Sequence, residues 1–342
     1  MGFRVLKGGM LTTVQDFGRN GYQSQGFSVG GAMDVRAFKL ANMLLDNPEN
    51  EAVLEITLIG PELEFTADTI IAITGGDFSP KLNGEPVEMY TAVYVRKGDV
   101  LKFGSARTGT RCYVAFSGYL DIPVVMGSRC TSLKSRLGGF KGRKLEEGDY
   151  ISERVKRRYL PFFLSRKLKA PDYDADDGLL RVVMGPQDSL FSKQSIRTFL
   201  QSEYTVTGEF DRMGCRLDGP IIAPKETSDI ISDGIALGAI QVPSAGKPIV
   251  LLADRQTTGG YAKIATIISV DIPRLVQKKT DQKIRFRAVT VQEAQRLYLQ
   301  EVKELERMRK EIHTPCREVL EVRQVAKRLE RLYADAETQR YF

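Results

Sequence analysis

Polar side chains that could bind or transform a small molecule crowd into one short stretch of this 342-residue chain. An apolar run at 249–252 is followed by an acid, an amide, hydroxyls and a pair of glycines: Asp254, Gln256, Thr257, Thr258, Gly259, Gly260 and then Tyr261. Such loops at strand ends commonly carry binding and catalytic groups. Gln241, Pro243 and Lys247 precede this run. A hairpin turn would explain the glycines but not Asp254, Gln256 and Lys247 together, so we expect a small polar ligand to bind here.

A second polar region lies near the start of the chain. It spans 12–19 and 30–34 and includes Gln15, Asp16, Arg19, Gly31 and Asp34, with Asn42 a little further on. Its glycines would let loop backbone approach a ligand closely. Turns and a helix cap use the same residue types, and on residue type alone that plainer interpretation is favoured.

The single histidine, His313, stands among charged residues near the end of the sequence. A Ser-His-Asp triad, a Cys-His pair or a His-rich metal site would therefore require His313 to fold back into the core. The four cysteines, at 112, 130, 215 and 316, are far apart and show neither zinc-ligand spacing nor a disulfide framework. We expect no metal site, and we expect proton transfer to use Asp, Glu, Lys, Tyr or a partner's residue.

Neither nucleic acid nor a membrane is an expected partner. The net charge is +7, but much of the positive charge lies at 154–169, directly before an acidic run at 172–177. This arrangement favours a solvated connector over a phosphate-binding surface. No apolar run reaches the roughly 18 residues of a membrane span, and the first residues lack the apolar stretch of a signal peptide, so we expect a cytoplasmic protein.

Two β-rich units account for most of the chain. Short β-type runs extend from about 3 to 151, with one expected helix at 34–45 capped by Asp34. A second strand-rich unit follows the charged connector. Apolar residues then recur at helical spacing from Val291 to Ile312, and after Pro315 a second helix is expected to carry Val322, Val325, Leu329 and Leu332. The expected divisions are an N-terminal lobe at 1–152, a connector at 153–178, a second lobe at 179–289 and a helical tail at 290–342.

The two polar blocks, in this order and with 184–187 (Met-Gly-Pro-Gln) and 211–214 (Asp-Arg-Met-Gly) between them, resemble the allophanate hydrolase subunit 2 family, also called biotin-dependent carboxyltransferase-like. The resemblance covers roughly positions 3 to 290. It implies a mainly β chain of two cyclophilin-like β-barrel lobes. The C-terminal helical extension departs from the family pattern.

The resemblance also implies a function shared with other proteins of a complex. The family includes the C subunit of the bacterial ATP-dependent 5-oxoprolinase, which opens the lactam of 5-oxoproline to glutamate together with the A subunit of that enzyme and its KipI-like B subunit. The chain lacks a Gly-x-x-x-x-Gly-Lys-Ser/Thr phosphate loop, so ATP would be held by a partner or an unfamiliar pocket. Two alternatives stay open, because binding and catalytic grooves use the same residues. One is a carboxyltransferase acting on urea or a similar amide with biotin on another protein, and the other is a KipA-like regulator that binds a KipI-type kinase inhibitor.

The same resemblance implies which positions form the substrate site. In the first lobe they are Gln15, Asp16, Arg19, Gly31, Asp34 and Asn42, and in the second Gln241, Pro243, Lys247, Asp254, Gln256, Thr257, Gly259, Gly260 and Tyr261. We assign Arg19 or Lys247 to the substrate carboxylate, Gln241 and Gln256 to amide hydrogen bonds, and Asp254, with Lys247, to the catalytic step. We expect loops of both lobes to converge on one cleft, with Arg19 and Asp254 on the same side.

Overall fold

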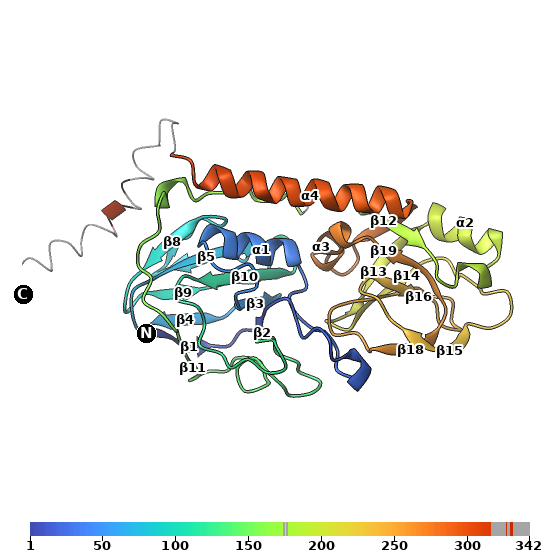
Figure 1. The fold of residues 1–342 in the computed structure, drawn as a ribbon, viewed down its shortest axis with the longest axis horizontal. Coiled ribbons are helices and arrows are strands. Elements are labelled where there is room, and N and C mark those ends of the chain that lie inside the picture. Colours follow the sequence, from blue (N-terminus) through green and yellow to red (C-terminus); the bar gives the residue numbers. More distant parts are fainter. Residues whose placement is uncertain (174, 176, 316–325, 327–328, 331–342) are drawn as a thin grey trace, which may run out of the picture.

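The computed structural model describes residues 1–173, 175, 177–315, 326 and 329–330. Two β-rich lobes lie next to each other, and a long helix, α4, runs along both of them (Figure 1). The prediction of a mainly β chain with a barrel and a C-terminal helical extension is confirmed. Among the described residues, no helix is long and apolar enough to cross a membrane.

The first lobe is built from two sheets. One has six strands in the order β11-β1-β4-β9-β6-β7, and the other has five in the order β2-β3-β10-β5-β8. Their bounds are β1 Gly2–Lys7, β2 Leu11–Gln15, β3 Val53–Thr57, β4 Glu62–Phe65, β5 Thr69–Gly75, β6 Lys81–Leu82, β7 Glu85–Pro86, β8 Ala92–Val95, β9 Val100–Lys102, β10 Arg111–Phe116 and β11 Tyr150–Ser152. β1 and β4 alternate buried and more exposed residues, whereas β5 and β10 are buried throughout. Both faces of β5 and β10 are covered, because helix α1 (Val35–Leu44) lies on the five-stranded sheet.

The second lobe is a closed barrel of seven strands in the order β12-β19-β16-β17-β14-β13-β20. Their bounds are β12 Leu179–Met184, β13 Glu203–Phe210, β14 Gly214–Asp218, β16 Ala239–Gln241, β17 Ile249–Leu251, β19 Lys263–Ile267 and β20 Lys283–Ala288. Two further strands, β15 (Asp229–Gly234) and β18 (Thr258–Tyr261), form a separate two-stranded ribbon. The helices of this lobe are α2 (Lys193–Gln201) and α3 (Ile272–Val276).

Helix α4 (Val291–Ile312) begins at the second lobe and ends on the first. The side chain of Thr290 caps its start by accepting from the backbone nitrogen of Glu293 at 3.1 Å. At its other end Leu305, Met308 and the fully buried Ile312 pack against the α1 side of the first lobe. Of the second helix expected after Pro315, Val322, Val325 and Leu332 lie outside the described residues, and only 326, Leu329 and 330 of that stretch are described.

The charge pattern predicted a solvated connector at 153–178, but part of this segment is buried. Leu160 and Leu168 are buried in the first lobe, and Arg166 is completely buried. The guanidinium of Arg166 donates to the carbonyl of Leu44 at 2.9 Å and forms an ion pair with Asp46. His313 Nε2 lies 2.9 Å from the same carboxylate. The connector and the end of α4 therefore meet on the first lobe, and its basic run is partly an internal feature.

Candidate functional site

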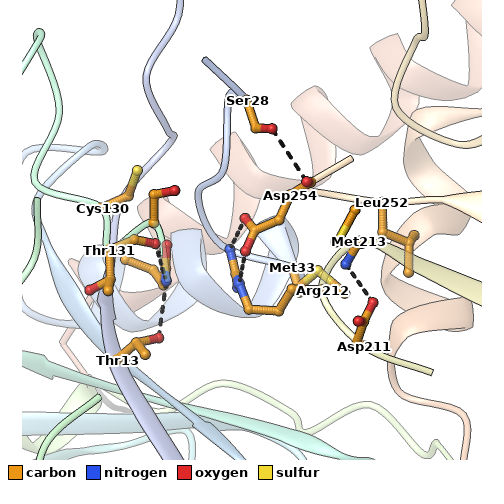
Figure 2. A network of polar contacts seen from close by, with 12 residues as sticks. Thr13, Ser28, Met33, Cys130, Thr131, Asp211, Arg212, Met213, Leu252 and Asp254 are labelled. Atoms are coloured by element: carbon orange, nitrogen blue, oxygen red, sulfur yellow. Dashed lines mark hydrogen bonds and ion pairs between the residues drawn. The ribbon is translucent and has the colours of Figure 1, made fainter. Parts of the chain in front are cut away.

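Two buried charged residues, Glu55 and Arg212, and the partly buried Asp254 join the two lobes, and we call these three residues the interlobe cluster. Arg212 Nε and Nη2 donate to the two carboxylate oxygens of Asp254 at 2.9 and 3.0 Å (Figure 2). Its Nη1 donates to Glu55, and Nη2 also donates to the carbonyl of Gly31 at 2.6 Å. Glu55 and Gly31 belong to the first lobe, while Arg212 and Asp254 belong to the second. A guanidinium suits this arrangement because it can donate in several directions in one plane.

The backbone of the second lobe fixes the relative positions of Arg212 and Asp254. Arg212 stands in the turn between β13 and β14, where the carboxylate of Asp211 accepts from the nitrogens of Met213 and Gly214 at 2.7 and 3.0 Å. The nitrogen of Asp254 donates to the carbonyl of Arg212 at 2.8 Å. Local turn chemistry therefore places the cation beside the acid that follows β17.

Glu55 is fixed by hydrogen bonds within the first lobe. Its Oε2 accepts from the backbone nitrogen of Met33 and from the hydroxyl of Tyr113, each at 2.8 Å. Burial raises the pKa of Tyr113, and the Glu55 carboxylate raises it further, so the phenol stays a donor. Burial opposes the charge on Arg212, but Asp254 and Glu55 more than offset this effect and raise its pKa. The guanidinium of Arg212 therefore stays protonated within the cluster.

A glycine loop of the first lobe reaches across to the second lobe beside the cluster. The nitrogen of Gly30 donates to the carbonyl of Ala253 at 3.1 Å, and the Ser28 hydroxyl donates to the carbonyl of Arg255 at 2.7 Å. Gly31 has a φ of +88°, and a Cβ there would lie 2.8 Å from the nitrogen of Gly18. This close backbone approach is why glycine is required at that position.

Arg19 and Asp254 lie on the same side of the molecule, as expected. Arg19 donates to the carbonyl of Cys130 at 3.1 Å, and a Cβ on Gly30 would lie 3.3 Å from the Cys130 sulfur and 3.5 Å from Oδ1 of Asp254. Cys130 therefore lies near Asp254 (Figure 2). However, Arg19 is only 1% exposed and also donates to the carbonyl of Val125 at 3.2 Å. Its guanidinium is thus used within the first lobe, which does not support the predicted contact with a substrate carboxylate.

Asp16 and Gln15 support the same region from within the first lobe. Asp16 accepts from Gly18 N and Ser128 Oγ through one oxygen, at 2.8 and 2.7 Å, and from Arg129 N through the other at 2.6 Å. Gln15 donates to Thr13 and to the carbonyl of Thr131 at 3.0 and 3.3 Å. The Oε1 atom of Gln15 is buried and has no hydrogen-bond partner among the described residues. An acceptor left in this state suits an N–H donor of a ligand.

Asp34 and Asn42 have structural roles in the first lobe. Asp34 caps α1 by accepting from Ala37 N at 2.8 Å, and its other oxygen accepts from Gln277 of the second lobe at 2.8 Å. Burial raises the pKa of Asp34. Asn42 donates to the carbonyl of Glu51 at 2.8 Å and accepts from Asn47 at 3.0 Å, which closes the loop after α1. The structure does not bring either residue into the interlobe cluster.

The predicted residues of the second lobe separate into two groups. Gln241, Gln256 and Gly259 converge, because a Cβ on Gly259 would lie 2.8 Å from Gln241 Nε2 and 3.5 Å from Gln256 Nε2. Gln241 Nε2 also donates to the carbonyl of Tyr261 at 3.4 Å, beside Gly260 in the ribbon. The Thr257 carbonyl accepts from Ile235 N at 3.1 Å and the Pro243 carbonyl from Gly246 N at 2.8 Å, so both contribute backbone contacts.

Lys247 lies apart from the interlobe cluster, at the other end of the β14 and β17 pair. Its Nζ lies 2.6 Å from the carboxylate of Asp218, at the end of β14, and 2.6 Å from the carbonyl of Gly219. In the antiparallel pair of β14 and β17, Gly214 opposes Leu251 and Arg216 opposes Ile249. Lys247 therefore stands at one end of this strand pair, whereas Arg212 and Asp254 stand at the other.

A cavity of about 300 Å³ lies where the lobes meet. Residues of the first lobe line one side and residues of the second lobe line the other: Phe17, Asn20, Gln23, Val29, Gly30, Ala32, Met33 and Val35, against Leu237, Leu252, Ala253, Arg255, Ile272 and Val276. Gly30 and Ala253 place it next to Asp254. Its volume is at the lower end of the range for small-molecule sites, which suits a compact polar ligand. Across the described part of the chain, no group of three or more His, Cys, Asp and Glu side chains could hold a metal ion.

Sequence reasoning missed two of the three residues of the interlobe cluster. Arg212 stood in the 211–214 block that carried the family resemblance, but it was given no role. Glu55 interrupts the apolar run of β3, and a charged residue inside such a run is itself a signal of a buried partner. The partner could not be read from the sequence, because Glu55 and Arg212 are 157 positions apart.

Comparisons with known proteins show which family the chain belongs to. Residues 25–288 match the carboxyltransferase domain, subdomains A and B. The 5-oxoprolinase C subunit of Escherichia coli K12 is 35% identical over 291 residues, which cover 85% of this chain and 92% of that protein. The protein of the same name from Haemophilus influenzae is 34% identical and covers 83% of this chain and 90% of its own length.

A solved structure extends the likeness to three dimensions. The crystal structure of Kluyveromyces lactis urea carboxylase matches with a TM-score of 0.81 and 28% identity, over 90% of this chain but 29% of that one. The family resemblance seen in the sequence is therefore confirmed. The chain belongs to the carboxyltransferase domain family, subdomains A and B.

Proposed function

We propose that this chain is the C subunit of an ATP-dependent 5-oxoprolinase, which opens 5-oxoproline to L-glutamate in complex with the A subunit of that enzyme and a KipI-like B subunit. The observation that carries the proposal is the match to two proteins that are named as 5-oxoprolinase C subunits, at 35% and 34% identity over 92% and 90% of their lengths. A compact cavity beside Asp254 supports it, because 5-oxoproline is a small polar ring.

The ring opening involves three chemical events. The carbon–nitrogen bond of the lactam breaks, a hydroxyl from water is added to the carbonyl carbon, and a proton reaches the leaving nitrogen. We assign the proton transfer to Asp254, since Arg212 fixes the orientation of its carboxylate. ATP, in this proposal, is bound by the complex and not by this chain alone.

The test is co-expression of this chain with the two other 5-oxoprolinase subunits, followed by a measurement of glutamate released from 5-oxoproline. We expect glutamate release that needs ATP and all three chains. A complex that assembles but releases no glutamate would overturn the proposal and favour a KipA-like regulatory role.

A second candidate is carboxyl transfer to urea or a similar amide, with biotin on a separate carrier. The fold match to urea carboxylase favours it, although this chain corresponds to only 29% of that protein. The Lachancea kluyveri urea amidolyase is likewise 31% identical, with 17% of its length covered. Co-purification with a biotinylated protein, together with carboxylation of urea, would support this reading over lactam hydrolysis.

A further inference from the structure

Lys263 is a lysine buried beneath the ribbon of β15 and β18. It belongs to β19 of the barrel, is 2% exposed, and lies opposite Gln241 of the neighbouring strand β16. Its Nζ lies 3.0 Å from Oδ2 of Asp233 on β15. Lysine is almost never fully buried without a partner, so the ion pair accounts for its position. The Asp233 side chain, however, is 53% exposed, so the group that covers the buried ammonium is itself at the surface.

The ribbon lies directly on the polar side chains of the barrel. In the ribbon Asp233 pairs with Gly259, and a Cβ on Gly259 would lie 2.8 Å from Nε2 of Gln241. Gln187 Nε2 donates to the same Asp233 oxygen as Lys263, at 3.2 Å. β15 and β18 bond to each other in a sheet separate from the barrel. The ammonium group of Lys263 and the amides of Gln187 and Gln241 thus lie next to the ribbon. The half-exposed carboxylate of Asp233 is one of the groups that join this ribbon to the barrel.

We propose that Lys263 is a carboxylate-binding residue and that Asp233 occupies its ammonium group until the carboxylate of a small lactam or amide takes that place. The identity of this ligand as 5-oxoproline rests on the proposed function. One carboxylate replaces another, so the charge around Nζ is unchanged, and Asp233 can turn into solvent because it is half-exposed already. The amides of Gln241 and Gln256 lie beside this position for the lactam group.

Two observations favour Lys263 over the cations that the sequence suggested. Arg19 is committed to carbonyls of its own lobe, and Lys247 stands at the far end of the β14 and β17 pair. Lys263, in contrast, lies beside Gln241, because the two residues are opposite each other in the pairing of β16 and β19. The competing explanation is a purely structural ion pair that fastens the ribbon. It predicts that removing either partner weakens binding alike, whereas displacement predicts opposite effects from the two partners.

The experiment compares Lys263→Met and Asp233→Asn in the three-chain enzyme. Lys263→Met should raise the KM for 5-oxoproline about tenfold or more, because a charge-assisted hydrogen bond is lost. Asp233→Asn should lower that KM about two- to fivefold, because the competing carboxylate is gone. Lys283→Met, which removes a lysine paired with Glu203 at 2.6 Å on the same barrel, should leave it unchanged. A KM raised by both Lys263→Met and Asp233→Asn, or by neither, would overturn the proposal.

A second measurement keeps this proposal separate from the proposed function. If the wild-type complex shows no turnover, the full chain labelled with ¹³C at the lysine Cε is titrated with 5-oxoproline and with 2-pyrrolidinone, the same ring without the carboxylate. The Lys263 signal, identified by its loss in Lys263→Met, should shift with the first ligand and not with the second. A Lys263 signal that shifts with neither ligand, or by the same amount with both, would refute a carboxylate site at Lys263.

Discussion

Individual residues in this protein are defined by partners that lie far away in the sequence. Arg212 holds Asp254 through two hydrogen bonds and also reaches Glu55 of the other lobe. Removing Arg212 would leave the carboxylates of Glu55 and Asp254 without their shared cation, whereas removing Asp254 would leave Arg212 paired with Glu55. Arg19 and Lys247 illustrate the converse, since each has a suitable charge but is committed to other contacts.

Glu153 gives a prediction at the same scale. Burial raises the pKa of Glu153 to about 7, against the opposing hydrogen bond from the Thr69 hydroxyl at 2.8 Å. The folded protein therefore holds this proton more tightly than the unfolded chain, whose value is near 4.5. The stability from this group is complete below pH 4.5 and is lost as the pH rises through about 7, with a size of at most about 3 kcal/mol.

Glu153→Gln removes this titration, so the fall in the free energy of unfolding between pH 5 and pH 8 should be smaller in the variant than in the parent. Urea unfolding at the two pH values measures the difference. Glu85→Gln, in the exposed strand β7, is the control. Equal falls in the parent and in Glu153→Gln would contradict the assignment.

At the scale of elements, the sequence predicted what depends on local pattern. The strand runs and the helices α1 and α4 follow from apolar spacing, and α1 also from its cap Asp34. Helix α2 was missed, because only Phe199 of its nine residues is buried and the apolar period is correspondingly weak. The pairing of strands into sheets and the burial of the connector depend on contacts between distant segments, which a single sequence does not reveal.

Helix α4 carries the prediction for this scale. Its last turns are docked on the first lobe, where Ile312 is fully buried, whereas Leu299 near its middle is 57% exposed. Ile312→Ala should lower the free energy of unfolding by about 2 to 4 kcal/mol, because it leaves a cavity in a packed core. Leu299→Ala should change it by about 0.5 kcal/mol or less. Urea denaturation compares the two, and equal costs would show that α4 is not anchored through its end.

The whole molecule is organised by contacts between the lobes. Gln277, after α3, accepts from Thr110 N and Arg111 N at 2.9 and 3.0 Å and donates to Asp34 and the Arg111 carbonyl at 2.8 and 2.9 Å. Every hydrogen-bonding position of this buried amide is thus used across the junction. Together with the interlobe cluster, it fixes the two lobes around the shared cavity.

The expectation that polar loops of both lobes meet was sound for Asp254 and the glycine loop at 30–31, since the nitrogen of Gly30 donates to the carbonyl of Ala253, next to Asp254. It failed for Lys247 because the sequence shows that a lysine is present but not which end of a strand pair it occupies. The position of the Arg212 side chain was likewise beyond reach, since its two carboxylates come from different lobes.

The most direct test of this account is the kcat of the three-chain enzyme carrying Asp254→Ala. Arg212 keeps its ion pair with Glu55 in this variant, so the chain should fold and assemble. We expect kcat for glutamate release to fall by about 10² or more, as for loss of a residue that transfers a proton. Assembly with an unchanged kcat would show that the chemistry takes place away from the junction of the two lobes.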